Sequence, residues 1–167
     1  MMVFEDEVAK RVALMPPITQ GDLSQPINFD WGTEEVLMKY LALKKKKSFP
    51  LIWLVEDEDS HEIYTPSVSR RATFVILYES QSPDQFNPYQ HEFAYNNILQ
   101  PVCDNFLKVF QLTSLFNRSD VVTQRIKNYS MRDASKSLVY ICNAIVIKAN
   151  IKFQGGICLP KTIDFND

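Results

Sequence analysis

Residues 138–153 read LVYICNAIVIKANIKF, and this stretch decides the fold. Its sixteen residues include no Gly, no Pro and no acidic side chain. From position 145 the residues alternate between two faces, with Ile145, Ile147, Ala149, Ile151 and Phe153 on one and Lys148, Asn150, Lys152 and Gln154 on the other. A period of two predicts a strand. Its first half should be buried on both faces, and its second half should have one wet face.

The length of this strand carries a second expectation. At ~3.3 Å per residue it would span roughly 50 Å, whereas common strands span ~17–20 Å. We expect such a strand to extend beyond its own small domain and to need a second surface to cover it. Ile147, Ile151 and Phe153 are therefore candidate contacts between subunits, and the pattern indicates assembly rather than catalysis.

Apolar residues spaced three to four apart predict helices. A short opening helix covers residues 3–14, and a long one covers about 89–116. Pro101 falls inside the long helix and should kink or split it near Leu99, because proline lacks the backbone N–H that a helix needs. Thr33 is a good N-cap for a third helix, with two glutamates directly after it.

Short β-branched and aromatic runs predict further strands, at residues 51–55, 61–64, 71–78 and 122–126. Helices and strands do not alternate strictly, so the class is α+β. We predict a mainly antiparallel sheet with the long kinked helix and the short N-terminal helix packed on one face. One domain is expected over residues 1–167, with a long loop excursion at about 16–32 and a C-terminal tail at about 157–167.

Two charge runs of opposite sign lie about ten residues apart: Lys44, Lys45, Lys46 and Lys47, then Glu56, Asp57, Glu58 and Asp59. Opposite runs on one small protein suit head-to-tail contact with a second copy, so all eight residues are candidate intersubunit contacts. Solvated loops beside a strand are the alternative interpretation of both runs.

No motif indicates catalysis, a cofactor or a metal. Cys103, Cys142 and Cys158 are widely spaced, and only His61 and His91 could serve as imidazole ligands, so no zinc site is expected. The acidic run lacks the glycine-punctuated spacing of a calcium loop. The chain has no P-loop, nucleotide-binding or nucleophile-elbow motif. We therefore expect a non-enzyme with buried, free thiols in a reducing compartment.

The chain shows no signal for a membrane or for nucleic acid. The N-terminus is acidic, and no apolar run approaches ~18 residues, so cytoplasmic synthesis and no membrane contact are expected. Nucleic-acid binding would rest on the lysine run with Arg70, Arg71, Lys148 and Lys152. Aromatic residues do not interleave with these cations, so binding of DNA or RNA is not our expectation.

The order of the expected elements resembles that of the small tail-completion, tail-terminator and neck (head–tail joining) proteins of tailed bacteriophages. The corresponding stretches are residues 3–14, 50–55, 70–78, 89–116 and 138–153. No residue signature is shared, so no functional residue is carried over.

This resemblance implies a non-enzymatic virion protein that assembles in the host cytoplasm. It also implies a homo-oligomeric ring, commonly hexameric, that terminates the tail tube or joins the tail to the neck, in contact with other tail or neck proteins. The alternative is a cytoplasmic binding module for a partner protein or nucleic acid.

Overall fold

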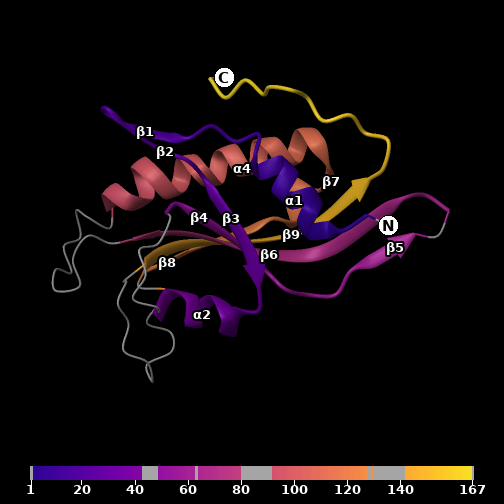
Figure 1. Cartoon of the computed structure of the whole chain (residues 1–167), viewed down its shortest axis with the longest axis horizontal. Coiled ribbons are helices and arrows are strands. Elements are labelled where there is room, and N and C mark those ends of the chain that lie inside the picture. Colours follow the sequence, from indigo (N-terminus) through magenta and orange to yellow (C-terminus); the bar gives the residue numbers. More distant parts are fainter. Residues whose placement is uncertain are drawn as a thin grey trace.

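The structure is a computed structural model, and it describes residues 2–42, 49–62, 64–79, 92–127, 129 and 142–166. Figure 1 shows one twisted sheet between two helical layers. Helices α1 (Phe4–Val12) and α4 (Gln100–Thr113) lie on one face of the sheet, and α2 (Glu34–Ala42) lies on the other. The mixed α and β content confirms the predicted α+β class, with its mostly antiparallel sheet.

The centre of the sheet is a long antiparallel pair formed by β6 (Ser67–Glu79) and β9 (Cys142–Gln154). Thirteen residues of each strand are paired, from Ser67 opposite Gln154 to Glu79 opposite Cys142. The first six residues of β9 are buried, and burial then alternates from Lys148 onward. This confirms the pattern expected from the sequence, within the part of the strand that the structure describes.

The other strands flank this pair, and the described part of the sheet has seven strands in all. They are β3 (Asn28–Gly32), β4 (Leu51–Val55), β5 (Ser60–Glu62), β7 (Leu115–Phe116) and β8 (Val122–Ile126). Strands β4 and β5 pair with the free side of β6, while β7 and β8 pair with the free side of β9. Strand β3 lies outside β4, and their pairing is parallel.

The expected loop excursion at 16–32 was wrong. This segment forms a small hairpin of β1 (Ile18–Gln20) and β2 (Leu23–Gln25), followed by β3 at the edge of the main sheet. The segment has the Pro, Gly and polar composition that is typical of a loop. Such a composition is tolerated in β3 because β3 is an edge strand with only one neighbour. By contrast, residues 157–166 contain no helix or strand, and they run above α4 in Figure 1.

The long helical stretch begins at Glu92 among the described residues and ends at Thr113. It opens with one short α-turn, continues as a π-helical segment at Tyr95–Leu99, and becomes regular α-helix at Gln100. Pro101 sits in the first turn of α4, where its missing N–H matters least. The change of helix type therefore falls at the predicted position, next to Leu99.

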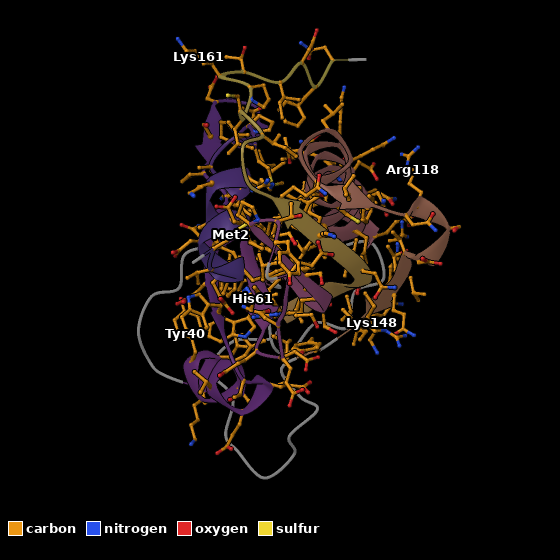
Figure 2. The ribbon with its side chains drawn as sticks, turned by 90° about the vertical axis from the view of Figure 1, so that its right-hand side faces the viewer. Met2, Tyr40, His61, Arg118, Lys148 and Lys161 are labelled. Carbon is orange, nitrogen blue, oxygen red and sulfur yellow. The ribbon has the colours of Figure 1, made fainter. Side chains whose placement is uncertain are left out.

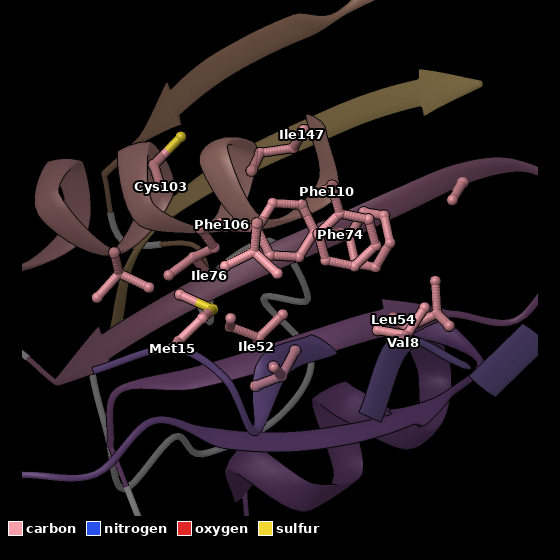
Figure 3. Packing of buried hydrophobic residues seen from close by; sticks show 14 of the residues in the cluster. Val8, Met15, Ile52, Leu54, Phe74, Ile76, Cys103, Phe106, Phe110 and Ile147 are labelled. Atoms are coloured by element: carbon pink, nitrogen blue, oxygen red, sulfur yellow. The ribbon is translucent and has the colours of Figure 1, made fainter. Parts of the chain in front are cut away.

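Aromatic side chains fill the space between α4 and the sheet (Figure 3). The ring of Phe74 on β6 lies 4.7 Å from that of Phe106, which stacks on Phe110 at 4.2 Å. On the opposite face, α2 buries Leu37 and Leu41 in a second cluster with Trp53. The Oγ1 atom of Thr33 accepts a hydrogen bond from the backbone N–H of Val36 at 3.2 Å, which confirms the predicted N-cap.

The buried Arg11 holds α1 on this core. Arg11 donates to the Thr113 carbonyl oxygen at 2.8 Å and to Glu7 Oε2 at 2.8 Å, and its guanidinium lies 4.1 Å from the centre of the Phe153 ring. Burial alone would raise the pKa of Glu7, but hydrogen bonds from Lys10 and Arg11 outweigh it and lower that pKa. The ionised form of Glu7 is therefore part of the folded state.

The structure corrects one expectation about β9. Ile147, Ile151 and Phe153 are at most 1% exposed, and they lie in the core beneath α1 and α4 of the same chain. The described length of β9 does not extend beyond its domain, because β6 is equally long and pairs with it throughout. These three side chains are therefore not available as intersubunit contacts, since the chain's own helices cover them.

This placement predicts opposite results at two adjacent positions. Ile147→Lys puts an unpaired charge in the core and should lower the free energy of unfolding by more than about 4 kcal/mol. Lys148→Thr changes an exposed side chain on the other face and should stay within about 0.5 kcal/mol of the parent. Urea denaturation followed by circular dichroism measures both. An Ile147→Lys variant with an unchanged midpoint would contradict the burial of this face.

Candidate assembly edges

The sheet ends in two strand edges that have no further strand beside them in the described residues. On one side β3 and β5 are the outermost strands, since β3 pairs only with β4 and β5 only with β6, and on the other side β8 and β7 pair only with β9. Figure 2 views the molecule from the end that carries the β5–β6 turn, with His61 of β5 on one side of the sheet and Arg118 and Lys148 on the other. Unpaired edges offer backbone N–H and C=O groups to another chain.

The β5 side is acidic. We define the acidic edge as Glu56, Asp57, Glu58 and Glu62, whose side chains are all exposed. The backbone N–H of Glu56 donates to the Gly32 carbonyl at 2.9 Å, so the acidic run starts where β4 leaves the sheet beside β3. Three of the four predicted acidic contacts, Glu56, Asp57 and Glu58, are therefore exposed in the segment that connects β4 to β5.

Asp59, the fourth member of the run, is used inside the chain. It accepts a hydrogen bond from Arg70 Nε at 2.5 Å, and Glu5 accepts one from Arg70 Nη2 at 2.6 Å. Burial alone would lower the pKa of Arg70, but the hydrogen bonds to Asp59 and Glu5 outweigh it and raise that pKa. Arg70 is only 6% exposed, so it is not available to bind phosphate.

The opposite side carries the complementary charge. We define the basic edge as Arg118, Arg125 and Lys127, which come from the 3₁₀ turn before β8, from β8 itself and from the residue after it. All three are exposed. Arg125 Nη2 donates to Gln100 Oε1 at 3.0 Å, and its guanidinium lies 5.5 Å from the centre of the Tyr95 ring. Asp120 is the one acidic residue among them, so the edge stays net positive.

Sequence reasoning missed the basic edge, although it predicted β8. The four-lysine run, Lys44 to Lys47, was the expected basic partner, and it lies outside the described residues. The residues of the basic edge lie within the segment 118–127, and they become part of a sheet edge because β8 pairs with β9. These three residues form no recognisable sequence pattern, because isolated arginines and lysines are common on any protein surface.

Between the two edges lies an open polar face. Arg71 is opposite Asn150, and Lys148 and Lys152 are its diagonal neighbours on β9. Lys152 forms an ion pair with Glu62, whose pKa this hydrogen bond lowers. Within the described part of the chain, Arg71 and Lys148 have no acidic partner at ion-pair distance. A depression of about 430 Å³ lies along this face, with Leu115 on β7 at its border.

In the part of the chain that the structure describes, reactive groups are not gathered at one place. The described residues contain no group of three or more His, Cys, Asp or Glu side chains placed to hold a metal ion. Burial raises the pKa of the Cys103 thiol to about 12, so Cys103 is protonated at neutral pH and is a poor nucleophile. Cys142 is also buried, whereas Cys158 is exposed, contrary to the expectation that all three thiols are buried. His61 is exposed on β5, and His91 lies outside the described residues.

Comparison with known proteins found no matching family model and no match among curated proteins. None of the helices in the described ranges combines the length and the hydropathy that a bilayer crossing requires.

The burial of the cysteines predicts one reactive thiol per native chain. Ellman's reagent should modify Cys158 rapidly, while Cys103 and Cys142 should react only after unfolding. Cys158→Ser should remove the fast phase, and a guanidinium-unfolded sample provides the total thiol count. Fast modification of Cys103 in the native protein would contradict the burial and raised pKa described above.

Proposed function

We propose that this chain is a non-enzymatic structural subunit that forms a closed ring in a phage-like particle, where the ring terminates the tail tube or joins the tail to the neck. The observation that carries the proposal is the pair of unpaired sheet edges, acidic on the β5 side and basic on the β8 side. Each edge matches the opposite edge of a second copy better than it matches itself.

This charge arrangement favours head-to-tail contact. When the same patch meets its own copy in a twofold dimer, like charges face each other, and such juxtaposition costs several kcal/mol. A contact between the acidic edge of one copy and the basic edge of the next avoids this cost. Head-to-tail contacts repeat around an axis and produce a ring when the rotation closes.

The order of elements supports the place of the ring in a particle. The opening helix α1, the apolar strand β4, the basic residues Arg70 and Arg71 in β6, the long helix across the sheet and the long strand β9 occur in the sequence expected of tail-completion, tail-terminator and neck proteins. Strand addition at the edges would also protect surfaces that otherwise promote aggregation.

A second candidate function is a binding module for an anionic partner, and the unpaired Arg71 and Lys148 on the polar face favour it. Such a module would remain monomeric and would bind its partner in a salt-sensitive manner. Ring assembly instead requires the edges, which these two residues do not occupy.

Charge reversal tests the proposed contact. Glu56, Asp57 and Glu58 changed together to Lys should leave a chain with two basic edges, and Arg118, Arg125 and Lys127 changed together to Glu should leave a chain with two acidic edges. Each variant alone should associate at least about 30-fold more weakly than the parent, because like charges meet. An equimolar mixture should assemble again, with the two variants alternating. Sedimentation velocity of each sample measures the outcome.

The matched control is Asp22→Lys, which reverses an exposed charge in the β1–β2 turn, away from both edges. It should assemble as the parent does. Two charge-reversed variants that each assemble normally would contradict head-to-tail contact through these edges, as would a mixture that stays monomeric while the parent forms a ring.

A further inference from the structure

The turn that joins β5 to β6 presents an aromatic side chain entirely to solvent. Tyr64 is 99% exposed, and Thr65 and Pro66 beside it are exposed as well. A tyrosine side chain can bury about 150–250 Å² against a partner, and its ring and hydroxyl suit a surface that is apolar on one side and polar on the other. Among the described residues, no side chain buries the Tyr64 ring.

The turn is fixed in place by the end of β9. The backbone N–H of Gly155 donates to the Pro66 carbonyl at 2.6 Å. A Cβ atom at position 155 would lie 2.8 Å from Pro66 Cγ, so only glycine allows the two segments to approach so closely. The backbone that carries Tyr64 is therefore held before any partner arrives, which reduces the entropy cost of binding.

The depression on the polar face offers a complementary surface. Leu115 and Phe116 of β7 form its apolar border, and Arg71, Asn150 and Lys152 provide polar groups along its floor. Glu58 and Ser60 line the opposite border, on the β5 side. Leu115 is 51% exposed, which is high for a leucine beside a concave surface. The ring of a tyrosine would pack on Leu115, and its hydroxyl would reach the polar groups.

Register places these two features at the same end of the sheet but on opposite sides. Ser67, just after the turn, pairs with Gln154, and Leu115 pairs with Lys152 on the other side of β9. Strands β6 and β9 separate β5 from β7, a distance of about 14 Å at the usual strand spacing. The turn belongs to the acidic side, whereas β7, which forms the apolar end of the depression, lies on the basic side, so head-to-tail contact brings the turn of one copy toward that end of the depression in the next.

We infer that Tyr64 of one copy inserts between Leu115 and the polar floor of this depression in a second copy of the chain. This inference rests on the proposed function, because the partner is the neighbouring subunit in the ring. Edge charges orient the two copies, and the buried tyrosine supplies most of the affinity, as aromatic residues at the centre of interfaces commonly do.

Substitution of the tyrosine tests the inference. Tyr64→Ala should weaken subunit association at least roughly 30-fold, as for an interface hot spot. Tyr64→Phe keeps the ring and should weaken it by less than about tenfold, since only a hydrogen bond is lost. Phe93→Ala is the matched control, because Phe93 is 51% exposed at the start of the long helix and belongs neither to the two edges nor to the lining of the depression. It should leave association unchanged.

Photocrosslinking identifies the receiving surface. The full chain with p-benzoylphenylalanine at position 64 should crosslink between copies to the peptide that contains Leu115. A parent that stays monomeric would overturn both the ring and this inference. A parent that forms rings while Tyr64→Ala assembles equally well, or crosslinks that map elsewhere, would overturn the tyrosine contact and leave the ring proposal intact.

Discussion

The antiparallel pairing of β6 with β9 is the constraint on which the rest of the structure depends. Thirteen residues of each strand are in register, so the apolar side chains on one face of both strands pack under α1 and α4 together, and those on the other face pack against α2. A shift of one residue would turn Ile147 and Phe153 to the solvent and Lys148 and Lys152 into the core. The burial of these residues therefore fixes the register, and the register fixes which side chains reach the polar face.

The same ladder creates the surfaces to which we assign function. Because β6 and β9 pair along their whole described length, every other strand must join on an outer side, and two edges result. The acidic residues of one edge and the basic residues of the other lie on opposite sides of a single rigid sheet. The molecule therefore has two different, oppositely charged sides. A head-to-tail assembly needs such a pair of sides, whereas a monomer does not.

Periodicity was sufficient to predict the elements whose environment is local. The alternation after Ile145 and the apolar run Leu51–Val55 each depend on neighbouring residues alone, and both predictions are confirmed. Next to Pro101 the long helix changes from π-helical to α-helical but continues, so it is not split there. Strand β3 was missed because its partner β4 is distant in the sequence, with helix α2 between the two strands. Ile147 was wrongly expected to be buried by another subunit. The sequence does not show that β6 is as long as β9 and pairs with it throughout. The basic edge was missed because the sequence does not show that β8 pairs with β9 and becomes an outer strand of the sheet.

The central claim is that this chain assembles head-to-tail into a closed ring, and its solution mass tests that claim most directly. Light scattering on a sizing column, repeated over a wide range of protein concentrations, would measure it. The account predicts a species near six copies of the 19.4 kDa chain, with a mass that reaches a limit and does not grow as the concentration rises further. A mass of one chain at every concentration, or a twofold dimer as the largest species, would contradict it.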